Sequence, residues 1–355
     1  MRIVCAMSGG VDSSIAAALM VEQGHEVIGM TMTLYDASKS IRRGRGGSCC
    51  SPAEVDLAKR VCDQLGIRHY TVDEVERFRD AVIDNFVREY AAGRTPNPCA
   101  RCNEHVKFGP LIDRATALGA ERLVTGHYAR VVDGDLHRGL DPSKDQSYFL
   151  FAMGRANLER VDFPLGAWTK DQVRARAHEL GMPNAAAPDS QEICFVPGGD
   201  HGEIVEQRAK ALGLDTGLLA PGEIRDEGGR VLGEHRGIHR VTVGQRRGLG
   251  VAGARPVYVL RVIPQERAVV VGEIDGLYQS EFRLRDLCRM ADVPRSGDLR
   301  ADVQIRHRAA PIPATIALDG ESASVCFDEP VRAVAPGQAA VFYEGDRLLG
   351  GGWII

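Results

Sequence analysis

No apolar run in this 355-residue sequence approaches the roughly 18 to 20 residues that a membrane-spanning helix requires. Residues 1–10 also lack the basic, then hydrophobic, then small-residue order of a signal peptide. Both absences predict a cytoplasmic protein without a membrane partner.

A strong positive charge is absent as well. The 44 Lys and Arg residues are outnumbered by 48 Asp and Glu residues, which gives a formal net charge of −4. No field of the whole molecule therefore attracts polyanions, and any nucleic-acid surface has to be local. Apolar residues at 44% and charged residues at 26% are ordinary for a soluble folded protein, and the length suits two or three domains.

The nine cysteines do not suggest a disulfide framework, because their number is odd and they are scattered through a chain with no export signal. Reduced thiols used for packing, metal binding or catalysis are expected instead. Packing is the expected role of Cys5, Cys62, Cys288 and Cys326. Cys49 and Cys50 lie in a Gly-, Ser- and Arg-rich segment, residues 36–51, which we predict to be a mobile loop. Adjacent thiols there could relay sulfur or have no role, and we expect no catalytic role.

Short β-branched runs alternate with helical stretches over roughly the first 126 residues. The pattern predicts strands at residues 2–7, 26–33, 68–72 and 123–125, and helices at 12–24 and 52–65. Such alternation is typical of a parallel sheet covered by helices on both faces, with ligands at the carboxyl ends of its strands. Short strands separated by glycines predict an all-β region beyond about residue 217. The fold class is therefore α/β, with a parallel-sheet domain at 1–205, a small central β-rich domain at 206–280 and a C-terminal β-barrel at 281–355.

A glycine-rich loop follows the first predicted strand. Its sequence, Ser-Gly-Gly-Val-Asp-Ser at residues 8–13, gathers backbone N–H groups, hydroxyls and a helix start around one point, which suits an anion. The lysine of the Walker motif and the dinucleotide pattern Gly-x-Gly-x-x-Gly are both missing, so an ATPase that transfers the γ-phosphoryl group is disfavoured. The alternative is a simple glycine turn with Ser13 as a helix cap.

This loop resembles the PP-loop of ATP pyrophosphatases, which cleave ATP between the α and β phosphates and pass AMP to a substrate oxygen. The resemblance implies that ATP binds with Mg²⁺ and that the ends of two later strands contact the nucleoside. It assigns to the nucleotide site Ala6, Met7, Ser8, Gly9, Gly10, Val11, Asp12, Ser13, Met32 and Gly126.

Three cysteines suggest reactive thiols. Cys99 and Cys102 stand three positions apart in a proline-rich turn, and Cys194 follows in a similarly punctuated segment. The first two can approach one electrophile or one metal ion. Half of a zinc knuckle is one interpretation, although no second Cys-x-x-Cys completes four ligands. Packing, a redox pair, and sulfur or iron–sulfur chemistry are the others.

Taken together, the motifs resemble one family over nearly the whole length: the bacterial tRNA-specific 2-thiouridylases, which replace O2 of the wobble uridine by sulfur. Besides the loop, the matching blocks are GRTPNP at 93–98, TGHYAR at 125–130, KDQSYF at 144–149, the Cys194 segment, TVGQRRGLG at 242–250 and GGG at 350–352.

The resemblance implies roles for the three cysteines. Cys102 corresponds to the family's nucleophile, and Cys194 to the cysteine that carries a persulfide received from a donor protein. Because this chain has Cys99 where other members have aspartate, it also resembles a branch that holds a [4Fe–4S] cluster, with Cys99, Cys102 and Cys194 as its ligands. The persulfide and cluster mechanisms both remain open at this stage, and both require Cys102 and Cys194.

The resemblance also implies a tRNA surface. It assigns to tRNA binding Asn97, His127, Lys144, Asp145, Gln146, Arg306, His307 and Gln338. Each alone has a simpler structural interpretation, such as a strand cap, a turn residue or a solvated ion pair. The Arg-rich tracts at 42–45, 235–247 and 306–308 could neutralise phosphates despite the negative total charge.

The implied function is ATP-dependent 2-thiolation of the wobble uridine, by adenylation of uracil O2 followed by sulfur transfer. The implied partners are tRNA, with Lys, Glu and Gln acceptors, and a sulfur donor that is a cysteine desulfurase or a relay protein. Two alternatives remain. The protein could be another tRNA-modifying or amide-forming PP-loop enzyme, or a non-catalytic protein that binds tRNA or an iron–sulfur cluster.

Overall fold

The computed structural model describes residues 1–34, 52–189, 193–196, 198–251 and 255–355. The predicted loop at residues 36–51, with Cys49 and Cys50, lies outside the described residues. In the described part, every helix is too short or too polar to cross a membrane.

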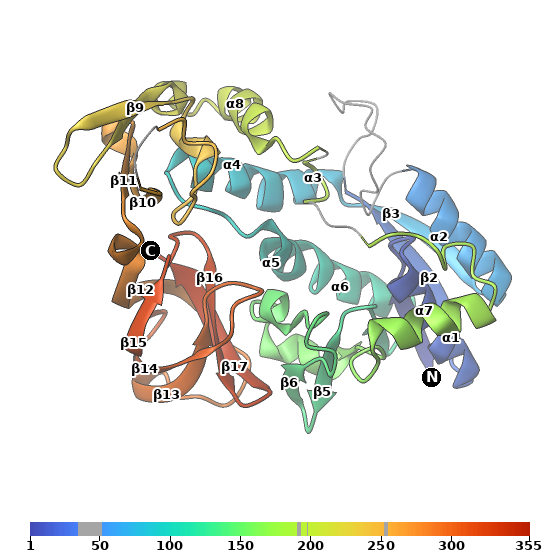
Figure 1. Cartoon of the computed structure of the whole chain (residues 1–355). Helices are drawn as coiled ribbons and strands as arrows, with labels where there is room; N and C mark the ends of the chain where they lie inside the picture. The colour runs from blue at the N-terminus through green and yellow to red at the C-terminus, as the bar shows by residue number, and fades with distance from the viewer. Residues whose placement is uncertain (35–51, 190–192, 197, 252–254) are drawn as a thin grey trace.

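A five-stranded parallel sheet forms the N-terminal part of the protein (Figure 1). The strand order is β3-β2-β1-β4-β7 and all pairs are parallel. The bounds are β1 (Arg2–Ala6), β2 (Glu26–Thr33), β3 (Arg68–Asp73), β4 (Arg122–Val124) and β7 (Val161–Asp162). The four predicted strands are confirmed, and β7 joins them at the sheet edge.

Helices cover both faces of this sheet, as predicted. α1 (Val11–Glu22), α2 (Pro52–Leu65) and α7 (Lys170–Glu179) contribute to the core on one face, and α3 (Val75–Phe78), α5 (Pro98–Cys102) and α6 (Pro110–Ala117) to the core on the other. Side chains of β1 alternate between the two cores, with Ile3 and Cys5 in the first and Val4 in the second. This alternation follows from the two-residue period of a strand and explains why β1 is apolar throughout.

Two π-helical turns interrupt the helices on the second face. One, at Arg79–Ile83, joins α3 to α4 (Asp84–Ala91), which packs with α8 (His201–Ala211) in a smaller core. The other, at Asn103–Lys107, directly follows α5. Turns of this kind often mark functional positions.

The hairpin of β5 (Ala129–Val132) and β6 (Asp135–Arg138) leaves the parallel sheet soon after β4. Its β6 edge pairs with β17 (Arg347–Ile354) near the C-terminus, with His137 opposite Arg347. The hairpin that follows β4 is therefore attached to the C-terminal barrel strand β17. Sequence analysis did not predict this connection.

The rest of the chain is β-rich, as predicted. A four-stranded sheet has the order β10-β11-β8-β9, with β8 (Gly222–Arg225), β9 (Val231–His235), β10 (Tyr258–Ile263) and β11 (Ala268–Gly272). The C-terminal strands are β12 (Tyr278–Arg289), β13 (Ser296–Gln304), β14 (Ile312–Asp319), β15 (Ser322–Arg332), β16 (Ala339–Glu344) and β17. They run in the order β12-β15-β14-β13-β16-β17, and the β12–β17 pairing closes them into a barrel.

The expected domain boundaries fall inside two of these elements. Residue 205 lies within α8 and residue 280 within β12. A helix or strand packs as one unit, so we propose boundaries in the loops that follow α8 and precede β12.

Candidate active site

The glycine-rich loop connects β1 to α1 at the carboxyl edge of the sheet. Gly9 has a φ of +79°, and a side chain there would place its Cβ 2.6 Å from the Glu54 carbonyl at the start of α2. The Ser13 hydroxyl donates to the Gly10 carbonyl (2.9 Å) and accepts from the Ser8 N–H (3.2 Å). Glycine is thus required by both backbone conformation and space, and the serine hydroxyls fix the turn.

The ends of two further strands adjoin this loop. A Cβ on Gly126, just after β4, would lie 2.7 Å from the Ser13 nitrogen and 2.8 Å from the Asp12 carbonyl carbon. Met7, at the end of β1, donates its N–H to the Met30 carbonyl (2.8 Å), and Met32 lies buried at the end of β2. The structure therefore gathers the predicted loop and strand ends at one edge; contact of each with ATP stays a prediction.

An ionic network that sequence analysis missed lies against the loop. The Lys170 ammonium, at the start of α7, donates to Asp12 Oδ1 (2.8 Å) and Oδ2 (2.9 Å) and lies 2.8 Å from Asp189 Oδ1. The Tyr128 hydroxyl also donates to Asp12 Oδ1 (2.7 Å). Asp189 accepts in addition from the Lys144 ammonium (2.7 Å) and the Arg174 guanidinium (2.9 Å).

These contacts change proton affinities. Burial acts to raise the pKa of Asp189, but the hydrogen bonds from Lys144 and Lys170 outweigh it and lower that pKa to about 2. Burial, together with the charge of Asp12, raises the pKa of the Tyr128 hydroxyl. At neutral pH Asp189 is therefore ionised and Tyr128 is a neutral donor.

Asn184 joins the network from a loop far along the chain. Its side-chain nitrogen donates to the Gly9 carbonyl (2.7 Å) and to the Ser14 hydroxyl (2.8 Å). Its oxygen is buried and has no hydrogen-bond partner among the described residues. One sequence pattern points to part of this network. The capping box Thr169-x-x-Gln172 predicts the start of a helix at Lys170, but it does not predict the contact with Asp12.

The cysteine helix α5 is short and firmly placed. Asn97 caps it by accepting from the Ala100 N–H (3.2 Å), and Pro98 occupies its first turn. The Arg101 guanidinium lies 4.0 Å from the ring centre of Trp353 at the end of β17. The Gln338 amide donates to the carbonyls of residues 95 and 96 (2.9 and 3.0 Å). The C-terminal barrel therefore supports the helix.

The three predicted thiols differ in exposure. Cys99 is exposed, Cys102 is 7% exposed, and Cys194 is half-buried. Cys102 belongs to the core that covers the second face of the sheet, and Cys194 packs against that same core. Among the described residues, no group of three or more His, Cys, Asp or Glu side chains is arranged to hold a metal ion. In this conformation Cys99, Cys102 and Cys194 therefore do not fit a cluster.

The residues assigned to tRNA binding all have partners within the protein. His307 lies 4.4 Å from the ring of Phe149 and makes a hydrogen bond with the Asp145 carbonyl (3.0 Å). The Gln146 side chain accepts from the Tyr128 N–H (3.0 Å). The structure thus joins the segment 144–146 to the barrel loop that carries His307, although the two are far apart in sequence.

Three other residues predicted to contact tRNA are buried or held by hydrogen bonds within the protein. Burial, and to a lesser extent the charge of Lys107, hold the pKa of His127 well below its ordinary value. The Arg306 guanidinium donates to the Arg332 carbonyl (3.1 Å). Asp145 accepts from Arg138 (2.9 Å). These contacts favour structural roles in the described conformation, and tRNA contact by these residues stays a prediction.

The cysteines expected to serve packing divide into two groups. Cys5 and Cys62 are fully buried, and burial is the main cause that raises the pKa of each thiol, to about 12 for Cys62. Cys288 is half-buried, and burial raises its pKa to about 11. Cys326 is exposed on β15, where buried and exposed residues alternate. The prediction that Cys326 serves packing is therefore wrong, because it occupies a solvent-facing position of the strand.

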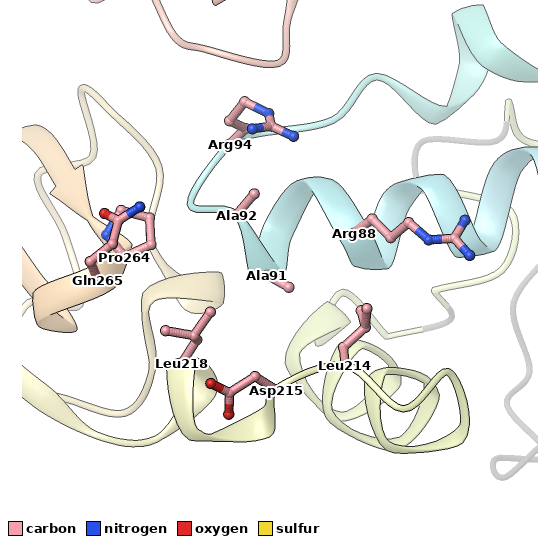
Figure 2. Close-up of a pocket in the computed structure, with 9 residues that line it drawn as sticks. All are labelled: Arg88, Ala91, Ala92, Arg94, Leu214, Asp215, Leu218, Pro264 and Gln265. Atoms are coloured by element: carbon pink, nitrogen blue, oxygen red, sulfur yellow. The ribbon is translucent and has the colours of Figure 1, made fainter.

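A cavity of about 340 Å³ lies away from the loop, between α4, the start of a short helical turn (Thr216–Leu219) and the turn at Pro264–Glu266 (Figure 2). Its walls include Ala91, Leu214, Leu218 and Pro264, with Arg88 and Arg94 at its side. Arg94 is held by Glu89 (2.6 and 2.9 Å). None of the predicted site residues lines it.

Comparison with known proteins covers almost the whole chain. Residues 1–198 match the family model described as the tRNA methyl transferase HUP domain. Residues 215–273 match the tRNA methyl transferase PRC-barrel domain, and residues 279–354 match the aminomethyltransferase beta-barrel domain.

Curated relatives are similar over more than nine tenths of their lengths. A protein of Rhodospirillum centenum is 47% identical, over 100% of this chain and 91% of its own. One of Rhizorhabdus wittichii is 50% identical, over 99% and 91% of the two chains. One of Geobacter metallireducens is 49% identical, over 99% and 96%. All three carry the name tRNA-specific 2-thiouridylase MnmA.

Proposed function

The chain belongs to the family of tRNA-specific 2-thiouridylases, and from this premise we propose that it uses ATP to replace O2 of the wobble uridine of tRNA by sulfur. The observation that carries the proposal is the 47% identity over the entire chain to a relative of that name. The enzyme is a tRNA uridine 2-sulfurtransferase, and AMP and pyrophosphate are its by-products.

The loop and its neighbours support the first step, adenylation. Uracil O2 attacks the α-phosphorus of ATP, and pyrophosphate leaves, so that a poor leaving group becomes an AMP ester. Backbone N–H groups at the start of α1 suit the phosphates. Mg²⁺ bound with ATP would neutralise phosphate charge, and the Asp12 carboxylate and the Ser8 and Ser13 hydroxyls are oxygen donors of the type it prefers.

Two thiols on one core support the second step, sulfur transfer. The outer sulfur of a persulfide on Cys194 attacks C2 of the activated uracil, and AMP leaves. The Cys102 thiolate then attacks the inner sulfur, which forms a Cys102–Cys194 disulfide and releases the thiouridine. A thiol reductant restores both cysteines before the next cycle. Their shared packing against the core of the second sheet face favours this pairing.

A [4Fe–4S] mechanism has less support, because the described thiols are not arranged as a ligand set. No step is therefore assigned to a cluster. Cys99 is exposed and lies one helical turn from Cys102, where it is available to an incoming sulfur donor.

The tRNA contacts and protein partners are further parts of the proposal. The segment that carries Lys144 and Gln146 contacts His307 of the barrel through the Asp145 carbonyl. Asn97 caps the cysteine helix, and the Gln338 amide donates to the carbonyl of residue 96 just before it. We propose that these residues receive the anticodon loop of Lys, Glu and Gln tRNAs. A cysteine desulfurase or relay protein supplies the sulfur.

The test is a reaction with unmodified tRNA, ATP, Mg²⁺ and a persulfide donor. Mass analysis of the digested tRNA is expected to show oxygen replaced by sulfur in the wobble uridine, with pyrophosphate released only when tRNA is present. Attachment of a nitrogen compound instead would identify another PP-loop enzyme. Absence of tRNA-dependent pyrophosphate release would identify a non-catalytic binding protein. A Cys326→Ala variant serves as the control because its thiol is exposed and remote in sequence from the proposed thiols.

A further inference from the structure

Asn103 directly follows Cys102 and has no part in the proposed sulfur transfer. Its side chain is buried, with the residue 2% exposed. Its Nδ2 donates to the Phe149 carbonyl (2.9 Å). Because a carbonyl can only accept, this contact fixes which end of the amide is the nitrogen. The other end of the amide, Oδ1, is therefore an acceptor.

This acceptor is left unsatisfied. Asn103 Oδ1 is buried and has no hydrogen-bond partner within the described part of the chain, although buried polar atoms nearly always have one. The same residue begins the π-helical turn Asn103–Lys107, and turns of this type are frequent at functional positions. Two independent features of the residue next to Cys102 therefore point to a ligand that donates a hydrogen bond.

The uracil has to come close to this residue. In the proposed transfer, C2 of the base bonds to the outer sulfur of the persulfide while the Cys102 sulfur attacks the inner one. Only these two sulfur atoms separate C2 from Cys102, and N3 is bonded directly to C2. Phe149 and Cys194 pack against the core that contains Cys102. Because Cys102 and Asn103 are adjacent and both buried, we expect the opening that admits uracil to the thiol to expose the amide as well.

We propose that Asn103 Oδ1 accepts a hydrogen bond from N3–H of the wobble uracil and thereby selects uridine against cytidine. This inference rests on the proposed function, because it takes the wobble uridine as the substrate. Cytosine also carries an O2, so the reacting atom alone does not distinguish the two bases. N3 of cytosine, however, is an acceptor without a hydrogen, and it would leave Oδ1 unsatisfied. The contact with Phe149 prevents the amide from turning to present its nitrogen instead.

The hydrogen bond should act on the rate as well as on binding. Adenylation of O2 withdraws electrons from the ring, which makes N3–H a stronger donor in the activated base than in the free one. An interaction that strengthens toward the transition state raises kcat. The amide oxygen does not take up the proton at neutral pH, so the hydrogen stays on N3 throughout and is present in the thiouridine product.

Two tRNAs that differ at one ring position test the proposal. One carries uridine at the wobble position, and the other carries 3-deazauridine, in which C–H replaces N3–H while O2 and O4 remain. The measured quantity is the ratio of kcat/KM for thiolation of the two tRNAs. We expect this preference for uridine to be about 10- to 100-fold larger in the native protein than in Asn103→Ala, because the variant has no acceptor to leave unpaired.

Comparison of ratios removes the intrinsic difference in reactivity between the two bases, since that difference is the same in both proteins. A merely structural role of Asn103 would lower thiolation of both tRNAs alike. An equal ratio in the native protein and in Asn103→Ala would therefore overturn the proposal.

Two further variants separate the acceptor from the Phe149 contact. Asn103→Asp keeps an oxygen in the place of Oδ1 and should retain the native preference for uridine; a ratio like that of Asn103→Ala would contradict the proposal. Asn157→Ala is the matched control, because Asn157 Nδ2 also donates to a backbone carbonyl, that of Met153 (2.6 Å). Its ratio should be the native one, and a reduced ratio would show that the measurement reports general disturbance and would overturn the inference.

If the Asn103 variants do not fold, binding to the native protein still tests the proposal. The native protein should bind the uridine tRNA about 10-fold more tightly than the 3-deazauridine tRNA, the size of one hydrogen bond, and equal Kd values would overturn the proposal. The proposed function fails separately: a native protein that thiolates neither tRNA contradicts that function, whereas one that thiolates both equally well contradicts only the role of Asn103.

Discussion

The nucleotide loop and the cysteine helix α5 are stabilised in opposite ways. Around the loop, charged and polar groups saturate one another: Asp12 accepts from both Lys170 and Tyr128. Around α5, apolar packing dominates, and Cys102 is part of a hydrophobic core. The first region has its charges arranged before a ligand arrives, whereas the second keeps its reactive thiol almost fully covered.

This difference suggests which part of the protein must change during the reaction. A preorganised ionic loop can bind phosphates with little rearrangement. A thiol that is 7% exposed cannot meet a uracil ring until the core around it opens. We therefore expect tRNA binding to rearrange the cysteine region more than ATP binding rearranges the loop.

The largest expected effect comes from the thiols. Cys102→Ala or Cys194→Ala should lower thiolation about 1000-fold or more, because each removes a sulfur on which the transfer depends. ATP binding should be unchanged in both, since the loop makes none of its described contacts through these cysteines. Sulfur incorporation into tRNA and the Kd of ATP are the two measurements. Thiolation retained in either variant would remove the persulfide mechanism.

The next effect concerns the loop alone. A side chain at Gly126 would meet the backbone of Asp12 and Ser13 at less than 3 Å, so Gly126→Ala must displace the start of α1. We expect ATP affinity to fall about 10- to 100-fold, corresponding to 1–3 kcal/mol of strain.

Gly109→Ala is the matched control for this substitution. Gly109 precedes α6, and no atom lies within 4 Å of where its Cβ would stand. ATP affinity should therefore stay at the native value. A Gly126→Ala protein that bound ATP normally would show that the loop tolerates displacement, and the contrast between a rigid and a rearranging region would weaken.

Local patterns in the sequence were enough to predict the loop and the sheet. The alternation of apolar strands and helices predicted β1, β2, β3 and β4, and strand order placed Gly126 beside the loop. The glycines and hydroxyls of residues 8–13 are contiguous in sequence, so they predict an anion site without knowledge of contacts between distant residues.

The ionic network could not be predicted in the same way. Lys170 and Asn184 contact the loop from segments more than 150 residues away, and Asp189 contacts Lys170. The surroundings of all three in sequence resemble ordinary helix starts and loops. The attachment of the β5–β6 hairpin to the barrel could not be predicted either. It depends on one strand pair, His137 opposite Arg347, and a single pair leaves no periodic pattern in the sequence.

A smaller effect tests the charge arrangement by pH. The pKa of Asp189 is lowered to about 2 in the folded protein, so its ionised form stabilises the fold above the ordinary carboxyl pKa of about 4. This contribution, about 2 kcal/mol at neutral pH, is lost as the pH falls through 2. Asp189→Asn should be less stable than the native protein at pH 6, and the gap should narrow by about 1 kcal/mol at pH 3.

Urea unfolding at the two pH values measures this gap. Asp286→Asn is the control, because the exposed Asp286 pairs only with Arg285 (2.9 Å) in the described structure and a surface ion pair contributes little. A gap for Asp189→Asn that is the same at both pH values would mean that the Lys144 and Lys170 contacts do not favour its charged form.

The smallest effect on the free energy of unfolding is expected for Cys326→Ala. Comparison with Cys62→Ala distinguishes an exposed thiol from one in a core. Cys326→Ala should change the free energy of unfolding by less than about 0.5 kcal/mol, whereas Cys62→Ala should cost about 1–3 kcal/mol, because Cys62 is fully buried and its loss leaves a cavity. Iodoacetamide should label Cys326 in the native protein well before Cys62, whose pKa of about 12 keeps it protonated. Mass spectrometry of the labelled peptides gives the order. If Cys62 reacted as fast as Cys326, the core between α2 and β2 would open on the timescale of the experiment, and burial would then not distinguish the two thiols.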